Sequence, residues 1–409
     1  MLALTTISAL GSFEAIYNYV PNSKVTPHNA IDLDQRDMEA ALSATTVDYA
    51  SAKNVYLNGA HSKSYSEITY TSTTQSTPAF TTAATCTGTT SAGDTVSGVL
   101  KSAVSATPAT SPATSVTIKC IYPTSNVQAT FCGCQVGSAY PTSNQVTTGC
   151  LNVAADVTIA EGATSLVMAA ADMVSTEKNG RTLYGFGKSS TMTSKLYVNS
   201  NSCPGCPYRD YQLFYNFYGA HGHSDDIVQG ALDGTAVQFA STPLAPYVKD
   251  YDFTTYSDDE TRTQVIKKTT AYMSVWMYTV REFEDAIDDC EVGNAANNDG
   301  SVHAWDEGVA FYTGSLEGTD GSGSGKLIAA LADKRCENFG TCSGTDGISG
   351  TSNVNTALLT EFQAGRNELI VFNCAAVRPI LTRVVSLMSI PLIQGTLRYA
   401  YKMGVQGPA

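Results

Sequence analysis

The sequence carries little charge for its length. Of 409 residues, 15% are Asp, Glu, Lys or Arg, against the usual quarter. Lys and Arg number 24 and Asp and Glu 37, giving a formal net charge of −13, and the basic residues form no cluster. Nucleic-acid binding needs such clusters to neutralise phosphates, so that class of function is excluded. Low charge with abundant Ser, Thr, Gly and Ala is typical of extracellular and cell-wall proteins.

Enzyme signatures are also missing. The sequence contains no Gly-x-Ser-x-Gly motif, no phosphate-binding loop, no His-Glu-x-x-His and no dinucleotide-binding glycine pattern. Histidine, the commonest general base, occurs only five times. We therefore expect a protein that is not an enzyme and needs no cofactor for catalysis.

No stretch reaches the roughly 18–20 apolar residues that a membrane span needs. The most apolar segment, Leu369–Leu397, is interrupted by two arginines and two prolines, Arg378, Pro379, Arg383 and Pro391. A pair of buried helices explains it, so we expect no membrane span. Met1–Ala15 has no basic residues before its short apolar run, so we expect the leader to be missing or already removed.

Eleven cysteines without zinc-finger spacing indicate an oxidising compartment and a disulfide framework. The odd number leaves one thiol, or one bridge to another chain. Cys336 and Cys342 could close a local loop, and Cys290 and Cys374, each near a predicted helix end, could link two helices. Cys203-Pro-Gly-Cys206 has a redox-like spacing, but no βαβ pattern surrounds it, so we retain it only as a disulfide candidate.

Composition divides the chain into three segments. Residues 1–61 comprise an N-terminal segment and a helix over 28–61, which Asp32 can cap. Residues 62–202 are rich in Ser, Thr, Gly and Cys, and their β-branched residues between turns predict short strands. Residues 203–409 form the main helical domain. The predicted fold is mainly α, a helical bundle with a disulfide-bonded β-rich insertion.

The helices of the last segment have recognisable ends. Ser257-Asp-Asp-Glu260 is a capping box that opens a helix to about Cys290. Ser301 can cap a second helix that Gly314 ends. Further helices are predicted over 325–337 and 355–376, and a last one from Pro379, which Pro391 kinks or divides.

His303, Asp306 and Glu307 stand at positions i, i+3 and i+4 of the second of these helices, so all three can share one face. An imidazole and two carboxylates within one turn could coordinate iron. Alternatively, Asp306 and Glu307 stabilise the first helical turn through its dipole, while His303 is hydrogen-bonded.

Further carboxylates lie on neighbouring helices. Glu282 and Asp285 belong to an acidic stretch at a helix end, which is either solvated or bridged by a cation. Glu361 and Glu368 stand two turns apart on an apolar helix. They are either metal ligands or paired with arginines, for which Arg366 and Arg378 are available. The candidate metal ligands are therefore His303, Asp306, Glu307, Glu282, Asp285, Glu361 and Glu368.

Tyr208–His223 is rich in tyrosine and ends with His221 and His223, just before Asp225 and Asp226. Phenolate, imidazole and carboxylate groups together are plausible ferric ligands. The interpretation we favour is an aromatic core helix that runs into a glycine-broken turn.

Val302–Cys342 resembles the characteristic stretch of the iron-assimilating, high-CO2- and low-iron-inducible periplasmic proteins of algae. Three stretches support the resemblance, which covers 28–61 and 203–403: Ala30–Leu42, Tyr208–Gly234 and Phe362–Tyr401. It implies secretion to the periplasmic space, cell wall or extracellular space, and a part in iron acquisition without known catalysis. The insertion at 62–202 departs from simpler members, and the resemblance carries over no ligand set.

Two functions follow as expectations. The first is a secreted protein that binds or concentrates iron at the cell surface, in contact with cell-surface uptake components. The second is a structural subunit of an extracellular fibre or coat, a homo-oligomer or filament in which strand edges or disulfides join the copies.

Overall fold

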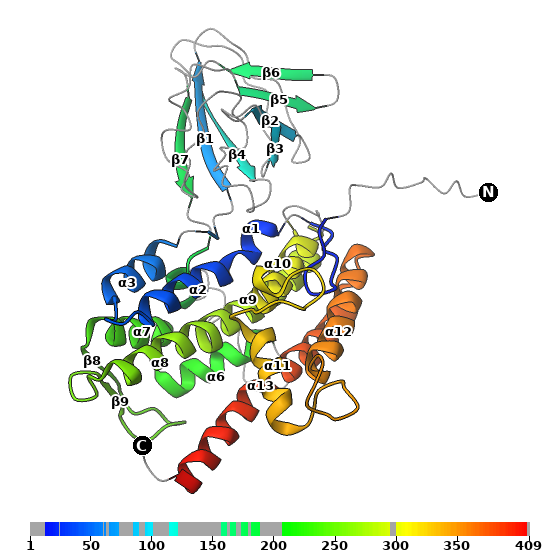
Figure 1. Cartoon of the computed structure of the whole chain (residues 1–409). Helices are drawn as coiled ribbons and strands as arrows, with labels where there is room; N and C mark the ends of the chain where they lie inside the picture. Colours follow the sequence, from blue (N-terminus) through cyan, green and yellow to red (C-terminus); the bar gives the residue numbers. More distant parts are fainter. Residues whose placement is uncertain are drawn as a thin grey trace.

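A computed structural model shows a mainly helical protein (Figure 1). It describes residues 13–23, 25–59, 61–62, 181–188, 207–294 and 300–406, together with the backbone of seven strands between 65 and 178. Cys203 and Cys206 lie outside these residues.

The predicted helix over 28–61 is three helices, α1 (Thr26–Asn29), α2 (Ile31–Leu42) and α3 (Tyr49–Asn58). Asp32 caps none of them, which corrects the sequence prediction. Its buried carboxylate instead accepts hydrogen bonds from the Ser315 hydroxyl (2.7 Å) and the Leu316 N–H (2.6 Å). Asp32 therefore makes a long-range contact between α2 and the second half of the chain, in place of the local cap that the sequence predicted.

Seven antiparallel strands lie between residues 65 and 178 in the order β6-β5-β2-β3-β4-β1-β7. Their bounds are β1 Tyr65–Ser72, β2 Thr85–Thr89, β3 Thr95–Leu100, β4 Thr114–Ile121, β5 Val157–Glu161, β6 Thr164–Met168 and β7 Met173–Lys178. The cysteine side chains of this region are outside the described residues, so a disulfide-bonded insertion stays a prediction.

Helix α4 (Leu183–Lys188) falls within the range that the sequence assigned to the insertion. It nevertheless packs into the helical core, because Leu183 and Phe186 are fully buried there. Next come α6 (Arg209–Tyr218), α7 (His223–Asp233) and a two-stranded hairpin of β8 (Ala236–Phe239) and β9 (Lys249–Asp252).

The capping-box helix is continuous as predicted, but it begins one residue later and with another cap. Asp258, not Ser257, accepts from the Thr261 N–H (2.7 Å) and opens α8 (Asp259–Thr269). A π-helical turn over Thr270–Ser274 joins α8 to α9 (Val275–Glu291).

Helix α10 (Ser301–Thr313) is the centre of the fold, with all of its residues buried. Gly300 is its N-cap, so the predicted Ser301 cap is wrong, while Gly314 ends it with φ +83° as expected.

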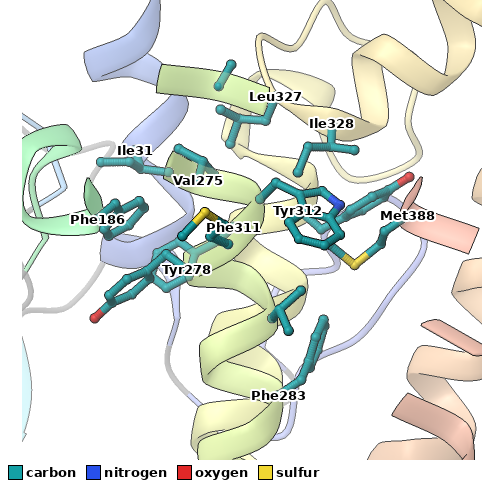
Figure 2. Packing of buried hydrophobic residues seen from close by; sticks show 14 of the residues in the cluster. Ile31, Phe186, Val275, Tyr278, Phe283, Phe311, Tyr312, Leu327, Ile328 and Met388 are labelled. Carbon is teal, nitrogen blue, oxygen red and sulfur yellow. The ribbon is translucent and has the colours of Figure 1, made fainter. Parts of the chain in front are cut away.

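Two glycines allow close packing of the helices around α10. A Cβ at Gly308 would lie 2.5 Å from the Phe283 ring, and one at Gly365 would lie 2.0 Å from Trp305. Figure 2 shows Phe283, Phe311 and Tyr312 in this core.

The helices between α10 and the last helix are η5 (Ser315–Glu317), α11 (Ile328–Phe339) and α12 (Asn353–Ile370). Two predicted disulfides are confirmed. Cys290–Cys374 joins the end of α9 to the start of the last helix, and Cys336–Cys342 closes the loop after α11. In both disulfides the cysteines lie at or near helix ends, as predicted from the sequence.

The last helix, α13 (Cys374–Gln406), is continuous through Pro379 and Pro391, so the predicted helix pair is wrong. Its first half packs in the core through Val377, Leu381, Val384 and Met388. Its second half extends past the other helices (Figure 1). By length and composition α13 could cross a membrane, and 33% of its most apolar window is buried in the protein. The expectation that no segment is long and apolar enough for a span is therefore corrected.

Candidate metal centre

Three buried side chains converge between α1 and α10. His303 and Glu307 stand one turn apart on α10, and His28 comes from α1, which packs against that helix. One ligand atom from each of the three lies within 4.8 Å of the others. The fold therefore gathers two imidazoles and a carboxylate in a buried place.

Both imidazoles approach the same carboxylate oxygen. His28 Nε2 and His303 Nε2 each lie 2.9 Å from Glu307 Oε1. Neither Nε2 makes a hydrogen bond of acceptable geometry with any described residue. Buried polar atoms without a hydrogen bond are uncommon in folded proteins, and these three side chains are a group that could hold a metal ion.

A hydrogen-bond chain fixes the tautomer of His303. The Ser23 hydroxyl donates to Asp306 Oδ2 (2.7 Å) and lies 3.0 Å from His303 Nδ1. Because the serine proton is used on the carboxylate, the hydroxyl accepts a proton from Nδ1 of His303. In the tautomer with its proton on Nδ1, Nε2 directs a lone pair at Glu307 Oε1. Two lone pairs at this distance repel unless a proton or a cation lies between them.

Asp306 anchors the N-terminal segment beside the site. Its two oxygens also accept from the Tyr19 hydroxyl (2.5 Å) and from the N–H groups of Asn22 and Ser23 (2.8 Å each). Burial raises the pKa of Asp306 to about 6, against the lowering effect of these hydrogen bonds. Asp306 thus holds residues 19–23 against α10 and orients His303 through Ser23.

Arg181 supplies the positive charge that faces the Glu307 carboxylate. Its Nη2 lies 2.5 Å from Glu307 Oε2 and 3.8 Å from Glu282 Oε1. Although burial alone would raise the pKa of Glu307, the charge of Arg181, together with the contacts to the His28 and His303 imidazoles, holds it well below its usual value. Burial lowers the pKa of His28 to about 4. Glu307 is therefore ionised and His28 neutral at pH 7, the forms in which both donate to a metal.

Glu282 adjoins the site without sharing its donor atoms. Arg281 pairs with one of its oxygens (2.5 Å), and Arg181 stands between the other and Glu307. Burial raises the pKa of Glu282 to about 7, with the Glu307 charge adding to the effect and both arginines opposing it. Two buried carboxylates and two arginines therefore form one charge network.

The other predicted ligands have partners elsewhere. Asp285 pairs with Arg281 (3.2 Å), and Glu368 accepts from the Asn373 side chain (2.7 Å). Glu361 forms a bidentate pair with Arg383 (2.8 Å for both contacts), rather than with Arg366 or Arg378. Among the described side chains, the structure brings only His303 and Glu307 of the predicted set to the three-atom cluster.

His28 was not predicted. Its sequence signal is slight, since it is one of five histidines and follows a proline at the start of a helical stretch. The tyrosine-rich segment agrees with the interpretation of an aromatic core helix. His223 stacks on Tyr218 (4.2 Å between ring centroids), and Asp225 accepts from the Tyr56 hydroxyl (2.8 Å).

Comparison with known proteins gives one family and no individual relative. No curated protein and no solved structure matches the chain. The sequence profile of the Fea1 family, described as low iron-inducible periplasmic protein, matches residues 2–404. The match spans the segment 62–202 as well as the helical parts, and its description agrees with the predicted periplasmic or secreted location. The chain therefore belongs to the family of low iron-inducible periplasmic proteins.

Proposed function

We propose that this protein binds iron in the periplasmic or extracellular space, without catalysing a reaction, through His28, His303 and Glu307. One observation carries the proposal, the convergence of two imidazole Nε2 atoms on a single carboxylate oxygen in the buried core. Low-iron induction of the family supports iron as the ion.

The donor set favours ferrous iron. Two imidazoles and one carboxylate are the ligands of non-haem Fe(II) sites, which keep further positions open. Ferric iron prefers more oxygen donors, and both oxygens of Asp306 are occupied by hydrogen bonds. Zinc and copper suit the same donors, so selectivity in the periplasm would rest on which metal is available.

The surrounding charges suit reversible loading. Arg181 shares Glu307 with the proposed ion, which reduces the negative charge that the ion meets. Three protein ligands also leave coordination positions for water or an incoming acceptor. Such a site would hold iron near the cell and release it to uptake components.

Titration calorimetry with Fe(II) under anaerobic conditions tests the proposal. The native protein should bind one equivalent, and Glu307→Gln should weaken binding at least tenfold, since it replaces an ionic donor. Glu361→Gln is the matched control, because it removes the same charge from a pair on α12 and α13. Equal affinity in Glu307→Gln and Glu361→Gln, or no binding by the native protein, would refute the site.

A second function, subunit of a surface fibre or coat, has support in the exposed half of α13. Ile393, Leu397, Tyr401 and Val405 recur every four residues and are each at least 55% exposed. An apolar stripe of this kind is typical of an interface. Native mass spectrometry of protein taken directly from cells tests assembly, and a uniform monomer would count against it.

A further inference from the structure

A cleft of about 710 Å³ lies between α8, α11 and α13, separate from the metal centre. Its apolar lining includes Tyr272 just after α8, Leu331 of α11 and, from α13, Leu392 and Met403. Basic side chains on α8 and α11 form much of its polar lining. The cleft therefore combines an apolar wall with positive charge.

Arg335 is the unusual member of this lining. It is 6% exposed, and its guanidinium donates from Nη1 to the Asn338 side chain (2.8 Å). Its Nε has no hydrogen-bond partner, and no described carboxylate lies within ion-pair distance. A buried guanidinium without a counter-ion is costly, so an arginine of this kind is suited to an anion supplied from outside.

Three lysines add to the charge of Arg335. Lys267, Lys268 and Lys334 also line the cleft, while Glu39 is the one acidic residue of its lining and pairs with Lys326 outside it (3.4 Å). The cleft therefore gathers positive charge in a protein whose net charge is −13.

One contact shows how these charges act inside the cleft. Lys268 Nζ lies 4.5 Å from the centre of the Tyr399 ring, whereas Lys267 Nζ donates to the Ser43 hydroxyl (2.7 Å), which is not part of the lining. Burial alone would raise the pKa of the Tyr399 hydroxyl. The positive charges of Lys268, Arg335 and Arg398 outweigh this effect and lower the pKa. Anionic groups are stabilised in this space.

We propose that the cleft binds a soluble amphiphile with one anionic head of the carboxylate type, which pairs with Arg335, and an apolar chain, which lies against α13. Arginine presents parallel N–H groups that match a carboxylate, and the apolar lining gains from excluding water. A membrane surface is a poorer partner, because anionic lipids repel a protein of this net charge and the arginine lies below the surface. The inference does not depend on metal binding.

The chain offers a matched pair of variants. Gly395 lines the cleft on α13, and a Cβ added there meets no atom within 4 Å. Gly395→Phe should therefore fill the cleft without disturbing the fold. Gly404, also in α13 and also open, does not line the cleft, so Gly404→Phe controls for the change in composition.

Titration calorimetry of the full chain with dodecanoate is the test. We expect one site, an affinity at least tenfold lower in Gly395→Phe and native affinity in Gly404→Phe. Lys334→Gln, an exposed change, should weaken binding severalfold even if Arg335→Gln fails to fold. Dodecyl maltoside and dodecyltrimethylammonium should bind at least tenfold more weakly than dodecanoate.

Three outcomes would overturn the proposal. They are equal binding of the neutral or cationic detergent, unchanged binding in Gly395→Phe, or no binding of dodecanoate. Co-sedimentation with anionic phosphatidylglycerol vesicles that exceeds dodecanoate binding would instead identify a membrane surface as the partner. Fe(II) titration of Gly395→Phe should match the native protein, so failure of the cleft and failure of the metal centre are distinguishable.

Discussion

His28 Nε2 lies 2.9 Å from Glu307 Oε1, although one residue belongs to the N-terminal segment and the other to the second half of the chain. The contact is buried and lacks hydrogen-bond geometry. The oxygen receives the second imidazole, that of His303, at the same distance. A metal ion held by these three side chains would join the N-terminal segment to α10.

Ser23 should control metal affinity without touching the metal. In Ser23→Ala the hydroxyl that links His303 Nδ1 to Asp306 is lost, so the imidazole is free to change tautomer. Loss of such an outer hydrogen bond typically costs about 10–100-fold in metal affinity. We expect a loss of this order in Fe(II) titration, with a change in unfolding free energy of only about 1 kcal/mol. If Ser23→Ala binds Fe(II) as tightly as the native protein, the hydrogen bonds from His303 through Ser23 to Asp306 do not orient the imidazole.

Arg181→Met should destabilise the metal-free protein more than the loaded one. Removing Arg181 leaves Glu307 as a buried charge without its closest counter-ion, at a cost of about 3–5 kcal/mol. A bound cation would take over that role. Urea unfolding of native and variant protein, with and without Fe(II), measures the two costs. Equal destabilisation in both states would indicate that no cation contacts Glu307.

Glu317 should make stability depend on pH. Burial, with the charges of Asp333 and Asp32, raises the pKa of Glu317 to about 7, although a Gly325 N–H lowers it. Between pH 4.5 and 7 the folded protein holds a proton that the unfolded chain releases, so unfolding free energy falls as pH rises through this window.

The Glu317 effect should be on the order of 2 kcal/mol after allowance for solvent screening. Glu317→Gln carries no titrating proton and should flatten this part of the profile while stabilising the protein at pH 8. Urea unfolding at half-unit pH intervals gives the comparison. An unchanged slope in Glu317→Gln would assign the effect to other groups.

The disulfide Cys290–Cys374 should matter more than Cys336–Cys342. The first closes a segment with a sequence separation of 84, and the second one of 6. Because loop-closure entropy grows with loop length, replacing Cys290 and Cys374 by serine should cost about 4–5 kcal/mol, and the same change at Cys336 and Cys342 roughly 2 kcal/mol less. Thermal unfolding of the two double variants checks the order, and a reversed order would contradict it.

The sequence alone determined what depends on local spacing. Polar residues and glycines placed most helix ends of the second half within a few residues, because such signals act over one turn, although the predicted caps Ser257 and Ser301 each missed the true cap by one residue. The spacing of His303 and Glu307 put both on one face of α10, and cysteines near helix ends anticipated both described disulfides. The resemblance in Val302–Cys342 indicated the family that the profile match then showed.

Tertiary packing decided the rest. Whether a carboxylate faces an imidazole, an arginine or a hydrogen-bond donor depends on what lies opposite, so Asp306, Glu307 and Glu361 have three different environments. His28 joins the site only because α1 packs on α10. The fold also kept α13 continuous through two prolines and left Arg335 without a counter-ion among the residues that the structure describes. Such features come from contacts between distant segments, which no local pattern encodes.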